Sequence, residues 1–186
     1  MENIIITPYI GLPARDVVLF LDSLRKFYNG KVLFFVGKND HELKRTLKYY
    51  ECSYEDVSLH KHDAVIKRYT LLINFLKKNS NLKKIFFCDS RDIYFQSNPF
   101  NFSYEGVLNF FSEDVKIGDC NVNSKWMKNT LGLGLFDELK KNFIICCGTV
   151  IGNTDAITNY AKQMNLMSKK YPYRWYKKRI KYLLTF

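Results

Sequence analysis

The chain has 186 residues, of which 47% are hydrophobic and 16% aromatic, so it has apolar mass for one sizeable core but too little length for two ordinary domains. Only 9 glycines and 4 prolines occur, which argues against general disorder, and no apolar run approaches the roughly 20 residues that a membrane span needs. The net charge of +11 favours a polyanionic partner: a nucleotide diphosphate, an anionic lipid or a nucleic acid.

Apolar runs that resemble buried strands alternate with longer amphipathic stretches, which is typical of an α/β fold whose helices connect parallel strands. The expected strands cover residues 4–8, 31–36, 57–60, 84–88, 106–111 and 143–151. The expected helices cover residues 14–28, 40–50, 64–78, 124–129, 136–141 and 154–169. In the helix over residues 64–78, the apolar side chains at helical spacing are expected to face inward: Val65, Tyr69, Leu72, Ile73 and Leu76.

No repeat and no linker divides the chain, so we expect one domain over residues 1–168 and a basic aromatic tail over residues 169–186. The tail suits either a solvated helix or an anionic membrane surface, with nucleic acid as the less expected partner. The five cysteines include no Cys-x-x-Cys pair, and the N-terminal residues lack the basic segment of a secretion signal. We therefore expect a cytoplasmic protein with reduced thiols, in at most peripheral contact with a membrane.

A polar segment, Asp89-Ser90-Arg91-Asp92, directly follows the apolar run at residues 84–88. Side chains at that position enter the crevice beyond the carboxyl ends of the strands, where open α/β sheets bind their ligands. We expect the carboxylates of Asp89 and Asp92 to converge there with the guanidinium of Arg91. Magnesium and manganese prefer carboxylate oxygens and complete their shells with waters and substrate phosphates, and an arginine can hold a phosphate through two hydrogen bonds. The alternative interpretation is an ordinary surface turn in which Arg91 pairs with an aspartate.

The wider segment from Phe87 to Phe100 resembles the signature of a group of GT-A-type glycosyltransferases: Asp-Ser-Arg-Asp, a short apolar stretch, Phe-Gln and then Pro-Phe. Upstream, Lys67-Arg68-Tyr69 resembles the group's basic-aromatic pair. Downstream, Cys147-Gly148-Thr149 resembles its Cys-Ser-Gly-Thr strand, with Cys147 where serine is usual. The similarity covers about residues 4 to 165.

The resemblance implies a GT-A-like, Rossmann-like three-layer α/β/α fold with a mainly parallel central sheet. It also implies a metal-dependent glycosyltransferase that moves a sugar from a nucleoside diphosphate sugar to a hydroxyl acceptor on a glycan, lipid or protein. The metal, Mn²⁺ or Mg²⁺, would bind Asp89 and Asp92. The residues expected to bind the donor are Arg68, Asp89, Ser90, Arg91, Gly148 and Thr149, and no catalytic base or nucleophile can be chosen from the sequence.

Two departures from the group's pattern leave other functions open. The commoner metal motif is Asp-x-Asp, whereas Asp89 and Asp92 are three residues apart. Members of the group usually continue past the last helix into a segment with Asp-Gln and a following Asn-Tyr, which does not occur before Phe186. The alternatives are a truncated or inactive glycosyltransferase relative, and a non-catalytic basic module that binds RNA or an anionic membrane surface.

Overall fold

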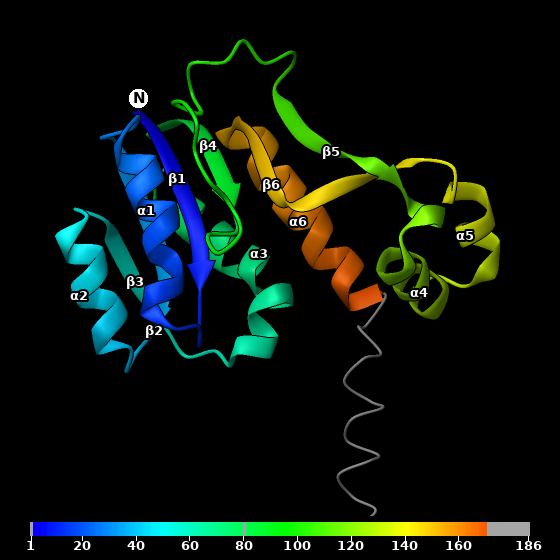
Figure 1. Cartoon of the computed structure of the whole chain (residues 1–186), viewed down its shortest axis with the longest axis horizontal. Coiled ribbons are helices and arrows are strands. Elements are labelled where there is room, and N and C mark those ends of the chain that lie inside the picture. The colour runs from blue at the N-terminus through cyan, green and yellow to red at the C-terminus, as the bar shows by residue number, and fades with distance from the viewer. Residues whose placement is uncertain (1, 80, 171–186) are drawn as a thin grey trace, which may run out of the picture. The chain divides into compact units, whose positions relative to one another are not determined.

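The computed structural model describes residues 2–79 and 81–170, without the side chain of His62. The strands within these residues form a six-stranded sheet in the order β3-β2-β1-β4-β6-β5 (Figure 1). Their bounds are β1 Glu2–Tyr9, β2 Lys31–Gly37, β3 Ser53–Val57, β4 Leu82–Cys88, β5 Leu108–Lys116 and β6 Phe143–Asn153. Neighbours among β3, β2, β1 and β4 pair in parallel, and β6 pairs with β4 in the antiparallel sense. The α/β class and the mainly parallel sheet expected from the sequence are confirmed, and the topology is compatible with a Rossmann-like fold.

The helices that connect these strands are a 3₁₀ turn η1 Ala14–Val17, α1 Val18–Arg25, α2 His41–Tyr49, α3 Lys61–Lys78, a second 3₁₀ turn η2 Ile117–Asp119, α4 Asn121–Thr130, α5 Leu133–Leu139 and α6 Thr154–Lys170. Asp40 caps α2 through a hydrogen bond from the Leu43 N–H to its carboxylate. Gly132, with φ of 92°, precedes α5 and turns the chain into it.

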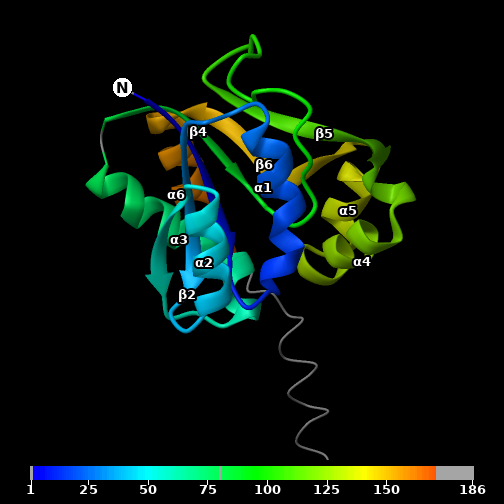
Figure 2. The same ribbon diagram turned by 60° about the vertical axis from the view of Figure 1, so that its left-hand side comes forward.

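Side chains alternate between the two faces of the sheet, and helices cover both faces. On one face, Ile5 and Phe34 share a buried cluster with Leu24 of α1 and Leu47 of α2. On the other face, the Phe35 ring packs against Phe75 of α3, and the Phe87 ring packs against Tyr69, which also contacts Tyr160 of α6. In Figures 1 and 2, α1 and α6 lie on opposite sides of β1. Helices therefore pack against both faces of the sheet, which is compatible with the Rossmann-like arrangement that the resemblance implies.

The chain forms two compact units. Within the described residues, unit 1 comprises residues 2–79, 81–110 and 147–163, and unit 2 comprises residues 111–146 and 164–170. The expected tail, residues 169–186, lies outside the described residues from residue 171 onward, so its separation from the rest of the chain stays a prediction. In the part of the chain that the structure describes, no helix combines the length and apolar character needed to cross a membrane.

Several details of the sequence prediction differ from the structure. The strand expected at residues 106–111 covers Leu108–Lys116, and the helix expected at residues 136–141 covers Leu133–Leu139. The third strand covers Ser53–Val57 and not residues 57–60, because this strand lies at the edge of the sheet and most of its side chains are exposed, so no apolar run marks it. Val65 of α3 was expected to face inward but is 62% exposed, whereas the other four predicted core residues of that helix are buried. Among the described side chains of α3, full burial begins at Arg68, and Val65 lies in the less buried first two turns of the helix.

Candidate functional site

The segment Asp89–Asp92 lies directly after β4, at the edge of the sheet where the parallel strands β1 and β2 also end. A hydrogen bond joins this segment to β1: the Thr7 hydroxyl donates to the Ser90 hydroxyl oxygen at 2.8 Å, and both side chains are buried. A buried hydroxyl needs such a partner because water cannot replace it. The turn after β4 is therefore fixed to the neighbouring strand at its second residue.

Asp89 is held by contacts on several sides. Arg68 of α3 donates from Nη1 to the Asp89 Oδ1 at 2.7 Å, and the Asp89 backbone N–H donates to the Gly148 carbonyl of β6 at 2.8 Å. A Cβ atom at Gly148 would lie 2.7 Å from the Asp89 Oδ2, closer than real Cβ contacts come. Gly148 therefore leaves the space that the second carboxylate oxygen occupies. The Asp89 side chain is still 49% exposed, so a ligand in solvent can reach it.

Arg68 is buried beneath this carboxylate, with only 6% of its surface exposed. Its Nη2 donates to the Cys147 carbonyl at 3.0 Å and to the Tyr69 hydroxyl at 3.1 Å, and the guanidinium lies 5.0 Å from the Tyr69 ring centre and 5.9 Å from that of Phe87. The face of an aromatic ring attracts a cation, so these two rings stabilise the charged guanidinium. Among the described residues, the buried Nε of Arg68 has no hydrogen-bond partner. The guanidinium of Arg68 thus contacts Asp89, Tyr69 and the Cys147 carbonyl from within the protein.

Burial lowers the pKa of Arg68, but the opposing effects of Tyr69, Asp89 and Cys147 are larger, so the net pKa is raised above the ordinary arginine value. The guanidinium therefore stays charged in its buried place. Burial also raises the pKa of the Tyr160 hydroxyl, with a further contribution from Tyr69, whose oxygen lies 3.4 Å away. The layer beneath Asp89 consequently holds the fixed positive charge of Arg68 beside the protonated hydroxyl of Tyr160.

Asp92 and Arg91 form a second, exposed ion pair. The Arg91 Nε donates to the Asp92 Oδ1 at 3.0 Å, with 55% and 75% of the two side chains exposed. This hydrogen bond is the main reason that the pKa of Arg91 is raised. Asp89 pairs with Arg68 and Asp92 pairs with Arg91, so the structure brings each predicted metal ligand to a separate arginine. No cluster of three or more His, Cys, Asp or Glu side chains that could hold a metal ion occurs in residues 2–79 and 81–170.

Further charged groups from the loops after β1 and β2 lie near the same edge. Tyr9 at the end of β1 donates a hydrogen bond to the Pro13 carbonyl at 2.7 Å. Burial raises the pKa of Tyr9 to about 12, and the negative charges of Asp16 and Asp40 raise it while Arg91 lowers it. Asp16 of η1, Asp40 at the start of α2 and Arg91 after β4 therefore act electrostatically on one hydroxyl.

The remaining predicted residues lie close by. Thr149 sits opposite Cys88 in the antiparallel pairing of β6 with β4, and both Gly148 and Thr149 are partly buried. Of the residues expected to bind the donor, Arg68, Asp89 and Gly148 are brought into mutual contact, Ser90 is buried against Thr7, and Arg91 points toward solvent beside Asp92.

Sequence reasoning missed Thr7, and it also missed the role of the Cys147 carbonyl. The sequence does offer a signal for Thr7. Its polar side chain interrupts a predicted central strand, between the apolar run Ile4-Ile5-Ile6 and Pro8. A backbone carbonyl gives no signal in a sequence, because its neighbours depend on the tertiary fold. No protein-family model and no curated protein matches this chain.

Proposed function

We propose that this chain is a GT-A-like, metal-dependent glycosyltransferase domain that binds a nucleoside diphosphate sugar at the carboxyl end of β4. The observation that carries the proposal is the half-exposed carboxylate of Asp89, which Arg68 and Gly148 hold in one orientation at the ligand-binding edge of an α/β sheet. The resemblance of the surrounding segment to the glycosyltransferase signature supports the same function. The acceptor would be a hydroxyl group of a glycan, lipid or protein.

The donor atoms at this edge fit Mn²⁺ or Mg²⁺. Asp89 and Asp92 supply hard carboxylate oxygens, and both side chains reach solvent. These two carboxylates alone are too few for an all-protein cage, which is the usual situation for a cation that also takes oxygens from waters and substrate phosphates. Such a cation would offset the negative charge of a departing diphosphate.

The surrounding residues divide into positioning and binding roles. Arg68 orients Asp89, because its guanidinium is buried and bonds to Asp89 and the Cys147 carbonyl. Arg91 is the side chain that we assign to the diphosphate, since it is exposed and next to Asp92. Gly148 and Thr149 belong to β6, the strand next to β4, and we assign them to the side of the site that would face the sugar of the donor.

A thermal-denaturation series tests the proposal. UDP and GDP are each added with and without Mn²⁺, to the wild type and to the variants Asp92→Asn and Asp137→Asn. Asp137→Asn is the matched control. Like Asp92, Asp137 is an exposed aspartate in an ion pair, in its case with a lysine, but it lies in α5. We expect at least one nucleotide to raise Tm only with Mn²⁺, the gain to vanish in Asp92→Asn and to persist in Asp137→Asn. A nucleotide effect that ignores both Mn²⁺ and the Asp92 substitution would contradict the proposal.

Two further measurements separate the alternatives. An inactive relative would show the metal-dependent gain in Tm but no hydrolysis of the matching nucleotide sugar, whereas an active transferase slowly releases the sugar to water. A basic module for RNA or anionic membranes would bind its polyanion equally well in Asp92→Asn, with an affinity that falls steeply as salt rises.

A further inference from the structure

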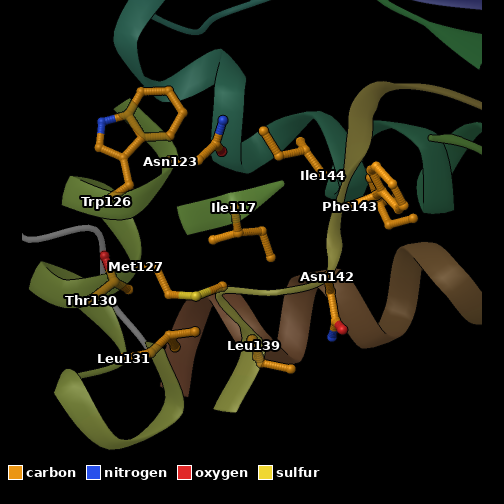
Figure 3. A pocket seen from close by; sticks show the side chains of 11 residues that line it. Ile117, Asn123, Trp126, Met127, Thr130, Leu131, Leu139, Asn142, Phe143 and Ile144 are labelled. Carbon is orange, nitrogen blue, oxygen red and sulfur yellow. The ribbon is translucent and has the colours of Figure 1, made fainter. Parts of the chain in front are cut away.

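Unit 2 contains an apolar cavity of about 770 Å³ that no part of the proposed function uses. Its wall is formed by Ile117, Trp126, Met127, Leu139, Phe143 and Ile144. Figure 3 shows the side chains of α4 on one side, those at the start of β6 on the other, and Ile117 between them. All of these residues belong to unit 2, so the cavity is a feature of that unit alone.

Hydrogen bonds fix the walls of the cavity to one another. The Ile117 N–H donates to the Asn142 carbonyl at 2.9 Å, and the Gly118 N–H donates to the Lys140 carbonyl at 2.8 Å. The buried Ser124 hydroxyl of α4 donates to the Ile117 carbonyl at 2.7 Å. These bonds join η2, α4 and the connection from α5 to β6, so the cavity has a defined backbone frame.

The cavity has the size and lining of a small-molecule site. Ligand pockets commonly measure about 300–1,000 Å³ and are lined by apolar and aromatic side chains with a few polar groups. Here the polar groups are the side chains of Asn123, Thr130 and Asn142. Trp126 is 45% exposed and Phe143 is 52% exposed, although both line the cavity, so an apolar ligand would remove them from water.

Two exposed lysines are the sequence neighbours of residues that line this cavity. Lys116 precedes Ile117 and Lys141 precedes Asn142, and the backbone hydrogen bond between Ile117 and Asn142 brings these two segments together. Both lysines are exposed. Ammonium groups beside an apolar cavity complement an anionic head group on an apolar chain.

We propose that unit 2 binds a single-chain amphiphile with an anionic head group, its alkyl chain in the cavity and its head beside Lys116 and Lys141. The apolar cavity complements the alkyl chain of the amphiphile, and the two lysines complement the negative charge of its head group. The site does not depend on the proposed sugar transfer, because none of the residues that line the cavity lies in the segment Asp89–Asp92.

Trp126 provides the readout. The chain has two tryptophans, Trp126 and Trp175, and the second lies outside the described residues. In a Trp175→Phe background, dodecyl phosphate below its micelle concentration is expected to shift the Trp126 emission to shorter wavelength in a saturable way. Dodecanol should bind at least fivefold more weakly, and inorganic phosphate should cause no shift. The absence of a saturable shift with dodecyl phosphate would overturn the proposal.

Variants in the Trp175→Phe background test whether the alkyl chain of the ligand binds in the cavity. Ile145→Asp introduces a charge at a cavity residue that is 55% exposed, so the fold should tolerate it. Val122→Asp is the matched control, because Val122 is 54% exposed on α4 but does not line the cavity. We expect the first variant to weaken dodecyl phosphate binding at least tenfold and the second to leave it within twofold. Equal losses in both variants would overturn the assignment to the cavity.

A second pair of variants tests the place of the head group. Lys141→Glu should weaken dodecyl phosphate at least fivefold and leave dodecanol within twofold, whereas Lys77→Glu, at an exposed residue of α3 in unit 1, should change neither. Equal losses in both variants would indicate attraction by the net charge of the chain and overturn the head-group assignment. Asp92→Asn should bind dodecyl phosphate like the wild type, so failure of the glycosyltransferase proposal and failure of this one give different results.

Discussion

Lys67 and Arg68 are neighbours on α3 and each pairs with an aspartate, but water reaches the two pairs to different extents. The Lys67 Nζ lies 3.2 Å from the Asp63 Oδ2, one helical turn away, and the lysine side chain is 53% exposed. The Arg68 side chain is 7% exposed where it meets Asp89. In an exposed ion pair the net attraction is modest, because water already solvates both charges. A buried cation has little water around it and depends on its protein partners for stabilisation.

Replacing each of these two residues by methionine should therefore have unequal effects on stability. Arg68→Met leaves the Cys147 carbonyl without its donor and Asp89 without its counter-ion, and we expect the free energy of unfolding to fall by about 2–3 kcal/mol, below the usual cost for a fully buried pair because Asp89 is half exposed. Lys67→Met should cost less than about 0.5 kcal/mol. Urea denaturation of both variants gives the comparison, and equal losses would contradict the positioning role of Arg68.

Gly148 should resist substitution for a reason that is local to Asp89. In Gly148→Ala the new methyl group would meet the Asp89 Oδ2 at 2.7 Å, so either the carboxylate or β6 must move. We expect a loss of about 1–3 kcal/mol in unfolding free energy, the usual cost of overpacking. Gly37→Ala is the control, because no atom lies within 4 Å of the added Cβ at the end of β2, and its stability should stay the same or rise slightly. Chemical denaturation distinguishes the two, and a neutral Gly148→Ala would contradict the steric argument.

At the scale of elements, the Thr7–Ser90 hydrogen bond connects β1 to the turn after β4 across 83 residues of sequence. Thr7→Val or Ser90→Ala alone leaves one buried hydroxyl without this partner, so each should cost about 1–3 kcal/mol. The double variant should cost less than the two single losses added together, because it removes both hydroxyls. Ser112→Ala, at an exposed residue of β5, should change stability by no more than about 0.5 kcal/mol. Additive losses in the Thr7 and Ser90 variants would argue against the bond.

The sequence predicts this fold well where burial leaves a periodic pattern. β1, β2 and β4 read as continuous apolar runs because helices cover both faces of the central strands, and their predicted positions are close to the observed ones. The sequence pattern does not locate β3, because an edge strand with exposed polar side chains does not differ from a loop in composition. The antiparallel direction of β6 also leaves no local signal, since strand direction depends on the path of the connecting chain.

The candidate site shows the same division between local and long-range information. Asp89 to Asp92 stand out in the sequence because charged residues follow an apolar strand without a break. The resemblance names Arg68 and Gly148 as candidates, but no local pattern shows that they contact Asp89, since Arg68 lies 21 residues before Asp89 and the Cys147 carbonyl lies 79 residues after Arg68. Only the tertiary fold shows that Arg68 and Gly148 converge on Asp89.

At the scale of the whole molecule, phenols and thiols packed into the core predict sensitivity to alkaline pH. Tyr28 is 8% exposed and donates a hydrogen bond to the Asn3 carbonyl at 2.9 Å. Burial raises the pKa of Tyr28 to about 12, with a smaller lowering by Arg25, and burial likewise raises the pKa of Tyr9 to about 12. Complete burial raises the pKa of the Cys88 thiol well above its usual value. These groups are therefore neutral in the folded chain at pH values where an unfolded chain would ionise them.

The sign of the effect follows from proton binding. A raised pKa in the folded state stabilises the fold fully below the unfolded value, near pH 10 for tyrosine, and this stabilisation is lost between about pH 10 and 12 as the unfolded chain releases its protons first. Each such group steepens the fall in unfolding free energy by up to about 1.4 kcal/mol per pH unit in that window. Tyr28→Phe removes one titrating group, so it should be less stable than the wild type at pH 8, having lost the bond to Asn3, yet lose stability less steeply above pH 10. Urea midpoints measured in reducing buffer from pH 8 to pH 11.5 give both slopes. Parallel curves for the two proteins would mean that the Tyr28 hydroxyl ionises equally easily in the folded and unfolded chain, contrary to its burial.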